Sequence, residues 1–127
     1  MKQGGILIIE DDLPLLEALA YRFKKEKYPV TVAKTGEAGL LALKKQKPSL
    51  LILDLVLPNL SGMEILEWLK EHQLSLPVIV YTARFLDKDL LAELKPYAPF
   101  EIVQKNGTLE KLVALVRKAL AQKEEAK

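Results

Sequence analysis

The chain has 127 residues, half of them hydrophobic and 28% charged, with a formal net charge of +2. This length suits one domain with a hydrophobic core, and the composition is typical of a soluble globular protein and excludes a disordered chain. Basic and acidic residues are scattered along the chain, which argues against binding nucleic acid by electrostatics alone. The absence of cysteine excludes a disulfide framework, a thiolate zinc site and a cysteine nucleophile.

The N-terminal segment has none of the features of a signal peptide. Residues Met1–Gly5 lead directly into a short strand-like run, without a basic stretch, a long apolar region or a cleavage site. No apolar run in the chain approaches the roughly twenty residues that span a bilayer. We therefore expect a cytoplasmic protein that does not insert into a membrane.

Short runs of mostly continuous apolar residues predict five β-strands. Such runs are expected in a parallel sheet that helices cover on both faces. The second run is the most polar, which favours a position at the edge of the sheet. The predicted strands are Ile6–Ile9, Val30–Ala33, Leu50–Leu53, Val78–Tyr81 and Phe100–Val103.

Longer segments with helical spacing of apolar residues alternate with these strands. Thr35 is placed to cap the second helix, and Ser61 and Glu64 have the spacing of a capping box. Pro96 must end the fourth helix, because proline lacks the backbone donor, and Tyr97–Pro99 then forms a rigid connection. The predicted helices are Leu13–Lys25, Gly36–Lys45, a segment from Ser61 to near His72, about Leu86–Leu94, and a last helix with an apolar stripe from Leu109 to Leu120.

The alternation of strands and helices predicts an α/β fold with a doubly wound, five-stranded parallel sheet. We expect a single domain over residues 1–127, with a core of about 5–121 and a polar tail over 122–127. In such sheets the ligand site lies beyond the carboxyl ends of the strands, at the point where the strand order reverses. The residues that follow each strand are therefore the candidates for function.

Polar side chains that could carry out phosphoryl transfer follow the predicted strands. Acids, a hydroxyl and an amine would converge at one edge of the sheet. Several carboxylates in one crevice repel each other unless a cation offsets their charge, and oxygen ligands in a partly open site favour Mg²⁺. A carboxylate nucleophile, a metal, a lysine and a hydroxyl are the parts that phosphoryl transfer requires. The candidates are Glu10, Asp11 and Asp12 after the first strand, Asp54 after the third, Thr82 after the fourth and Lys105 after the fifth.

Four segments at these strand ends resemble the receiver domain of two-component response regulators. They are Ile-Leu-Ile-Ile-Glu-Asp-Asp at residues 6–12, Asp-Leu-Val-Leu-Pro-Asn-Leu-Ser-Gly at 54–62, Tyr-Thr-Ala-Arg at 81–84, and the late Lys105. Each is a weak signal alone, but all four occur in the right order. The resemblance covers Ile6 to Leu120 and implies the flavodoxin-like (βα)5 fold of CheY, with strand order 2-1-3-4-5.

The resemblance also implies a role for each candidate residue. Glu10 and Asp11 match the acidic pair that holds Mg²⁺, and Asp54 matches the phosphoacceptor and a further metal ligand. The backbone carbonyl of Val56 would also bind the metal. Thr82 matches the hydroxyl residue that moves to the phosphoryl group, and Lys105 matches the amine that pairs with it. Pro58 and Gly62 match the loop after the phosphoacceptor.

Each assignment has an ordinary structural alternative. Asp12 is expected to cap the first helix rather than to bind the metal. Thr82 taken singly could be a turn residue, and Lys105 a surface lysine. His72 is expected to be solvated, and Trp68 to be a half-buried helix residue.

The chain departs from the family pattern at two places near the late lysine. Asn106 follows Lys105 where proline is usual, and Ile102 stands where a switching aromatic residue is common. These departures keep open a pseudo-receiver, a protein-interaction module without phosphoryl turnover. A third possibility, a hydrolase of the haloacid dehalogenase type, needs a second Asp two positions after Asp54, where this chain has Val56.

The functional hypothesis is a signalling domain rather than an enzyme, in which Asp54 takes a phosphoryl group from a histidine kinase or phosphotransfer protein. The domain would supply much of the catalysis of its own phosphorylation and dephosphorylation. Phosphorylation would then change the affinity of the last strands and helices for an output protein or domain. We expect no direct binding to nucleic acid.

Overall fold

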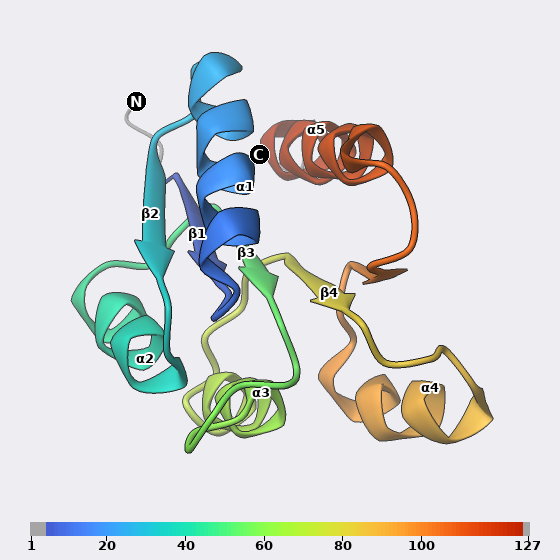
Figure 1. The fold of residues 1–127 in the computed structure, drawn as a ribbon. Helices are drawn as coiled ribbons and strands as arrows, with labels where there is room; N and C mark the ends of the chain where they lie inside the picture. Colours follow the sequence, from blue (N-terminus) through green and yellow to red (C-terminus); the bar gives the residue numbers. More distant parts are fainter. Residues whose placement is uncertain (1–4, 126–127) are drawn as a thin grey trace.

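The computed structural model describes residues 5–125 and contains a parallel sheet between two layers of helices (Figure 1). All four strand pairings are parallel, and the strand order is β2-β1-β3-β4-β5. This is the order that the family resemblance implied, so the predicted fold class is confirmed. The strands are β1 Ile6–Ile9, β2 Val30–Ala33, β3 Leu50–Leu53, β4 Val78–Thr82 and β5 Glu101–Gln104.

The helices cover both faces of the sheet, with α1 and α5 on one side and α2, α3 and α4 on the other (Figure 1). A short 3-10 helix, Lys95–Tyr97, follows α4 directly. The α-helices are α1 Leu13–Lys25, α2 Gly36–Lys45, α3 Gly62–Glu71, α4 Lys88–Leu94 and α5 Leu109–Glu125. No helix in this described part of the chain is both long and apolar enough to cross a membrane.

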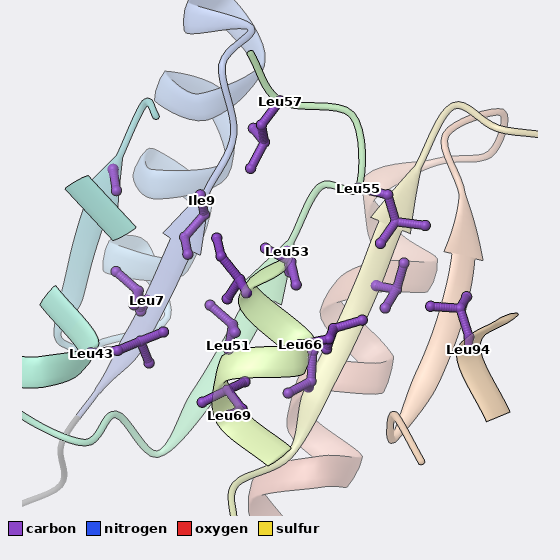
Figure 2. Close-up of a cluster of buried hydrophobic side chains, with 14 of the residues drawn as sticks. Leu7, Ile9, Leu43, Leu51, Leu53, Leu55, Leu57, Leu66, Leu69 and Leu94 are labelled. Carbon is purple, nitrogen blue, oxygen red and sulfur yellow. The ribbon is translucent and has the colours of Figure 1, made fainter. Parts of the chain in front are cut away.

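Two separate hydrophobic cores lie on the two faces of the sheet. On one face, side chains from α2, α3 and α4 pack on the sheet, and Figure 2 shows Leu43, Leu66 and Leu94 among them. On the other face, Phe23 of α1 and Val116 of α5 belong to the second core. Every residue of β1 and β3 is buried, whereas β2 is partly exposed, as expected for the predicted edge strand.

The polar residues that were predicted to cap helices do so. Thr35 accepts a hydrogen bond from the backbone of Ala38 at the start of α2. Ser61 and Glu64 form both hydrogen bonds of a capping box at the start of α3. Each cap satisfies backbone N–H groups that the helix itself leaves unpaired, which fixes where the helix begins.

The boundaries of α4, β5 and β4 differ from the sequence prediction. Helix α4 begins at Lys88 rather than Leu86, because Asp87 is extended and caps the helix by accepting from the Leu90 N–H. Strand β5 is shifted by one residue, since pairing with β4 sets its register and Gln104 is paired with Thr82. Thr82 itself is therefore the last residue of β4 and not the residue after it.

The connection around Pro96 and the C-terminal segment also differ from the prediction. Pro96 stands in the first turn of the 3-10 helix, where its missing donor is tolerated, and Ala98 then adopts a left-handed conformation with φ of 46°. Helix α5 continues to Glu125, beyond the expected start of the tail at 122, because this segment consists of strong helix formers. Residues 126 and 127 of the expected tail lie outside the described part of the chain.

Candidate functional site

The strand order brings the acidic residues together at the carboxyl edge of the sheet. Strands β1 and β3 are neighbours in register, with Ile9 opposite Leu53, so the residues that follow them are adjacent. The Asp54 N–H donates to the Ile9 carbonyl at 3.1 Å and extends this pairing by one step. Glu10 and Asp54 consequently meet where the chain leaves the two central strands.

Three carboxylates form a tight cluster at this edge. Glu10, Asp11 and Asp54 each place one oxygen within 4.8 Å of the others. Glu10 and Asp54 are almost completely buried, and Asp11 is exposed, so the cluster is open on one side. A buried group of like charges is unfavourable unless a cation lies nearby.

Lys105 supplies one such cation. Its Nζ atom lies 2.7 Å from Oε1 of Glu10 and 3.2 Å from Oδ2 of Asp54. The Lys105 backbone N–H also donates to the carbonyl of Thr82 at 2.7 Å, which fixes the start of its loop against the end of β4. The lysine that follows β5 thus reaches the carboxylates that follow β1 and β3.

The pKa values of the paired groups reflect this burial. Burial raises the pKa of Glu10, and the hydrogen bond from Lys105 only partly opposes it. Burial by itself would lower the pKa of Lys105, but the hydrogen bond to Glu10 and the charges of Asp54 and Glu10 outweigh it and leave that pKa raised. Lys105 is therefore an ammonium at neutral pH.

The cluster fits a divalent metal by its charge and by its donor atoms. Three carboxylates face one ammonium, so ionised carboxylates leave an excess of negative charge that a second cation would offset. All the donors are hard oxygen atoms, and the open side leaves room for water, the set that Mg²⁺ prefers.

Thr82 and Val56 are held by backbone hydrogen bonds around the carboxylates. Thr82 is completely buried at the end of β4, and its hydroxyl oxygen accepts from the Arg84 N–H at 3.0 Å. The Val56 N–H donates to Oδ1 of Asp54 at 3.2 Å. Both contacts fix short turns that follow β3 and β4 at the carboxyl edge of the sheet.

Asp12 has a different role from the three carboxylates of the cluster. Its carboxylate accepts from the Leu15 N–H at 3.2 Å and caps α1, as predicted. Its backbone N–H donates to Oε2 of Glu10 at 3.1 Å and so helps to orient the buried carboxylate.

The loop after Asp54 returns close to the Asp54 backbone at Gly62. The Gly62 N–H donates to the Leu55 carbonyl at 3.0 Å. A Cβ atom on Gly62 would lie 2.3 Å from the carbonyl oxygen of Asp54. Only glycine fits there, which explains why this position of the motif carries no side chain.

One contact of the site was not predicted from the sequence. The Lys105 ammonium lies over the ring of Tyr81, 5.7 Å from its centroid. Tyr81 is the first residue of the Tyr-Thr-Ala-Arg segment, but the sequence indicated no role for it in the site. Only the register between β4 and β5 brings the two residues together.

The comparison with family models identifies the family of the chain. Residues 6–117 match the response regulator receiver domain. The chain belongs to this family. It is thus a receiver domain of two-component signal transduction, and the departures at Ile102 and Asn106 occur within the matched segment.

Relatives of this receiver domain include bacterial transcriptional regulators. The uncharacterized transcriptional regulatory protein YkoG of Bacillus subtilis is 38% identical over 122 residues, which cover 96% of this chain and 53% of YkoG. The alkaline phosphatase synthesis transcriptional regulatory protein PhoP of B. subtilis is 33% identical over 106 residues, 76% of this chain and 44% of PhoP. The receiver chain spans about half the length of these relatives.

Solved receiver domains share the fold. The CheY-like receiver domain protein of Methanospirillum hungatei superposes with a TM-score of 0.88 over 96% of this chain and 97% of that one, at 22% identity. The response regulator DrrB of Thermotoga maritima gives a TM-score of 0.82 at 25% identity, covering 93% of this chain and 52% of DrrB.

Proposed function

We propose that this receiver domain accepts a phosphoryl group on Asp54 from the phosphohistidine of a histidine kinase or phosphotransfer protein. The observation that carries the proposal is the joint placement of Glu10, Asp11 and Asp54 within 4.8 Å, with Lys105 bonded to two of them. A structural ion pair needs only one carboxylate for each ammonium. The additional acids favour a site for a metal and a phosphoryl group.

Asp54 is the nucleophile in this proposal. One of its carboxylate oxygens forms a bond to phosphorus, the bond from phosphorus to the donor imidazole nitrogen breaks, and that nitrogen keeps the electron pair. Lys105 offsets the negative charge of the transferring group, and because its ammonium already contacts Asp54, little reorganisation is needed. The same site would catalyse hydrolysis of the acyl phosphate, which is the self-catalysed part of the cycle.

Glu10, Asp11, Asp54 and the backbone carbonyl of Val56 would hold the Mg²⁺ ion. When bound, the ion supplies positive charge to the phosphoryl oxygens and to the carboxylates that surround them. Glu10 is oriented for this task by the Asp12 N–H and Lys105, which each bind one of its two oxygens. Asp11 is exposed and can reach a ligand from the open side of the crevice.

Thr82 would couple the phosphoryl group to the rest of the molecule. Its hydroxyl oxygen accepts a hydrogen bond in this structure, so the hydroxyl proton is available to donate to a phosphoryl oxygen. Movement of Thr82 toward that oxygen would displace the turn at Arg84 and, through it, α4. The surface of β4, β5, α4 and α5 would then change its affinity for an output protein or domain.

We also propose that residues 1–127 contain this single receiver domain and that it acts in the cytoplasm. The family match over residues 6–117 supports these limits for the domain. The relatives named as transcriptional regulators are about twice as long as the chain. We therefore propose the output partner of this receiver only as a protein or a domain, without naming it. Direct contact with nucleic acid is not proposed for the receiver itself.

Incubation with Mg²⁺ and acetyl phosphate, followed by intact-mass measurement, tests the proposed function. We expect one phosphoryl group per chain and no label in Asp54→Ala. Asp12→Ala should retain the label, because it removes a nearby carboxylate that caps α1. Label on a different residue would overturn the assignment of Asp54. No label with acetyl phosphate or any kinase would support the pseudo-receiver alternative.

A further inference from the structure

Tyr81 lies buried on the same face of the sheet as the side chain of Lys105. Side chains alternate along β4, so Ile79 and Tyr81 belong to the core beneath α1 and α5. Tyr81 is paired with Val103 of β5, which belongs to the same core. Lys105 comes two residues after Val103, and its side chain therefore emerges on the side of the sheet where the Tyr81 ring lies.

The Tyr81 ring completes the surroundings of the Lys105 ammonium. Two directions around Nζ are taken by Glu10 at 2.7 Å and Asp54 at 3.2 Å. The Tyr81 ring lies 5.7 Å from Nζ, within the range of a cation–π interaction. Because Tyr81 is only 5% exposed, the ring is fixed by the core and offers a rigid surface to the lysine.

A lysine at this place needs such a surface. Its charge is carried on a flexible four-carbon stem, and holding that stem in one conformation costs rotamer entropy. An ammonium that swings into solvent no longer offsets charge at Asp54. A fixed aromatic face favours the inward conformation and also keeps water from one side of the ammonium, which strengthens its electrostatic attraction to the carboxylates.

We propose that Tyr81 is a positioning residue that holds the Lys105 ammonium against Glu10 and Asp54 for phosphoryl transfer. The inference rests on the proposed function, because it assigns the ring a part in that reaction. The interaction involves the ring, so phenylalanine can replace tyrosine at this position. An aliphatic residue fills much of the same volume but has no negatively polarised face for the ammonium.

The test compares three purified variants by their rates of labelling with acetyl phosphate and Mg²⁺. Tyr81→Phe is expected to react within about twofold of the unmodified protein, and Tyr81→Leu about tenfold more slowly, which corresponds to about 1.4 kcal/mol. Phe23→Leu removes a buried ring from the same core and controls for packing, because Phe23 lies near the C-terminal end of α1 and the acidic residues precede its N-terminal end. It is expected to lower stability without slowing the reaction.

A double-mutant cycle with Lys105→Ala separates positioning from a merely structural effect. If the ring acts through the ammonium, Tyr81→Leu slows a Lys105→Ala protein by less than about twofold. Equal slowing in both backgrounds would overturn the proposal. So would a Tyr81→Leu rate equal to that of the unmodified protein, or a Tyr81→Phe rate as low as that of Tyr81→Leu.

A measurement without phosphorylation keeps this inference separate from the proposed function. The ring current of Tyr81 should shift the NMR signals of the Lys105 ε-methylene protons upfield, in the unmodified protein and in Tyr81→Phe but not in Tyr81→Leu. Absence of label in the unmodified protein would contradict the proposed function alone. Unshifted Lys105 signals in the unmodified protein would contradict the positioning by Tyr81.

Discussion

Asp11 and Asp12 are neighbours in sequence with different tasks in the structure. Asp11 contributes an oxygen to the acidic cluster, whereas the Asp12 carboxylate accepts from the Leu15 N–H and caps α1. The distinction follows from geometry, since the chain turns from β1 into α1 between them. The two residues therefore offer a matched pair of aspartate substitutions for separating metal binding from stability.

Asp11→Ala is expected to weaken Mg²⁺ binding by more than about tenfold, because it removes a charge attraction of at least ~1.4 kcal/mol. Asp12→Ala should leave Mg²⁺ binding nearly unchanged and lower the free energy of unfolding by about 0.5–2 kcal/mol through the lost cap. Calorimetric titration with Mg²⁺ and urea denaturation measure the two effects. Equal losses of Mg²⁺ affinity in the two variants would show that the acidic pair has been assigned one residue out of register.

The residues of the site differ in how far the sequence could predict them. Glu10, Asp11, Asp54, Thr82 and Lys105 follow or end strands, and the rule that ligands bind at the carboxyl edge selects them without a structure. Tyr81 could not be selected in this way. It lies within β4, after a run of apolar residues, and its contact with Lys105 depends on the pairing of two strands that are separated by a helix.

At the scale of elements, the sequence predicted strand and helix identity well but not every boundary. Helices α1 and α2 have the predicted limits because proline, threonine and the capping residues act locally. Strand β5 and the start of α4 were misplaced by one or two residues. Their limits depend on tertiary pairing with β4 and on the extended conformation of Asp87, which no local pattern of apolar residues specifies.

The junction between β3 and α3 is the element boundary that constrains the site most strongly. Gly62 begins α3, and a Cβ atom there would meet the Asp54 carbonyl oxygen at 2.3 Å and the Leu55 Cα at 2.7 Å. Both are backbone atoms of the segment that carries the Asp54 carboxylate. They cannot move aside as the end of a side chain can, so a substitution would displace the site itself.

Gly62→Ala is expected to lower the free energy of unfolding by about 1–3 kcal/mol, the usual cost of overpacking, despite the better helix propensity of alanine. Gly107→Ala is the matched control, because a Cβ atom there has no neighbour within 4 Å. That variant should remain within about 0.5 kcal/mol of the unmodified protein. Urea denaturation measures the free energy of unfolding of both variants. An unchanged free energy of unfolding in Gly62→Ala would show that the loop can shift to accommodate a Cβ atom.

At the scale of the whole molecule, charged side chains join the first and last helices. Arg22 of α1 donates to both carboxylate oxygens of Glu110 in α5, at 2.6 and 2.9 Å. Arg117 of α5 donates to Glu26 at the end of α1, at 2.8 and 2.9 Å, and Arg22 also lies 3.5 Å from Glu26. The network connects segments that are about ninety residues apart and holds α1 and α5 together over their shared core.

The network has a defined dependence on pH. The hydrogen bond from Arg117 holds the pKa of Glu26 below its usual value of 4.5, and Arg22 does the same for Glu110. A carboxyl group whose pKa is lower in the folded than in the unfolded state stabilises the fold above the unfolded value. That contribution is lost as the pH falls through the folded value, since the unfolded state binds the proton more tightly than the folded state does.

Glu26→Gln is therefore expected to lower the urea midpoint at pH 7, and the difference from the unmodified protein should shrink as the pH falls below about 4. Added salt should reduce the difference at pH 7, because exposed ion pairs are screened. Glu17→Gln, which removes an exposed acid of the same helix, provides the control and should change the midpoint little at either pH. A Glu26→Gln effect that is the same at pH 7 and pH 3 would assign the stabilisation to packing of the side chain, because acidification removes the charge of Glu26 but not its side-chain volume.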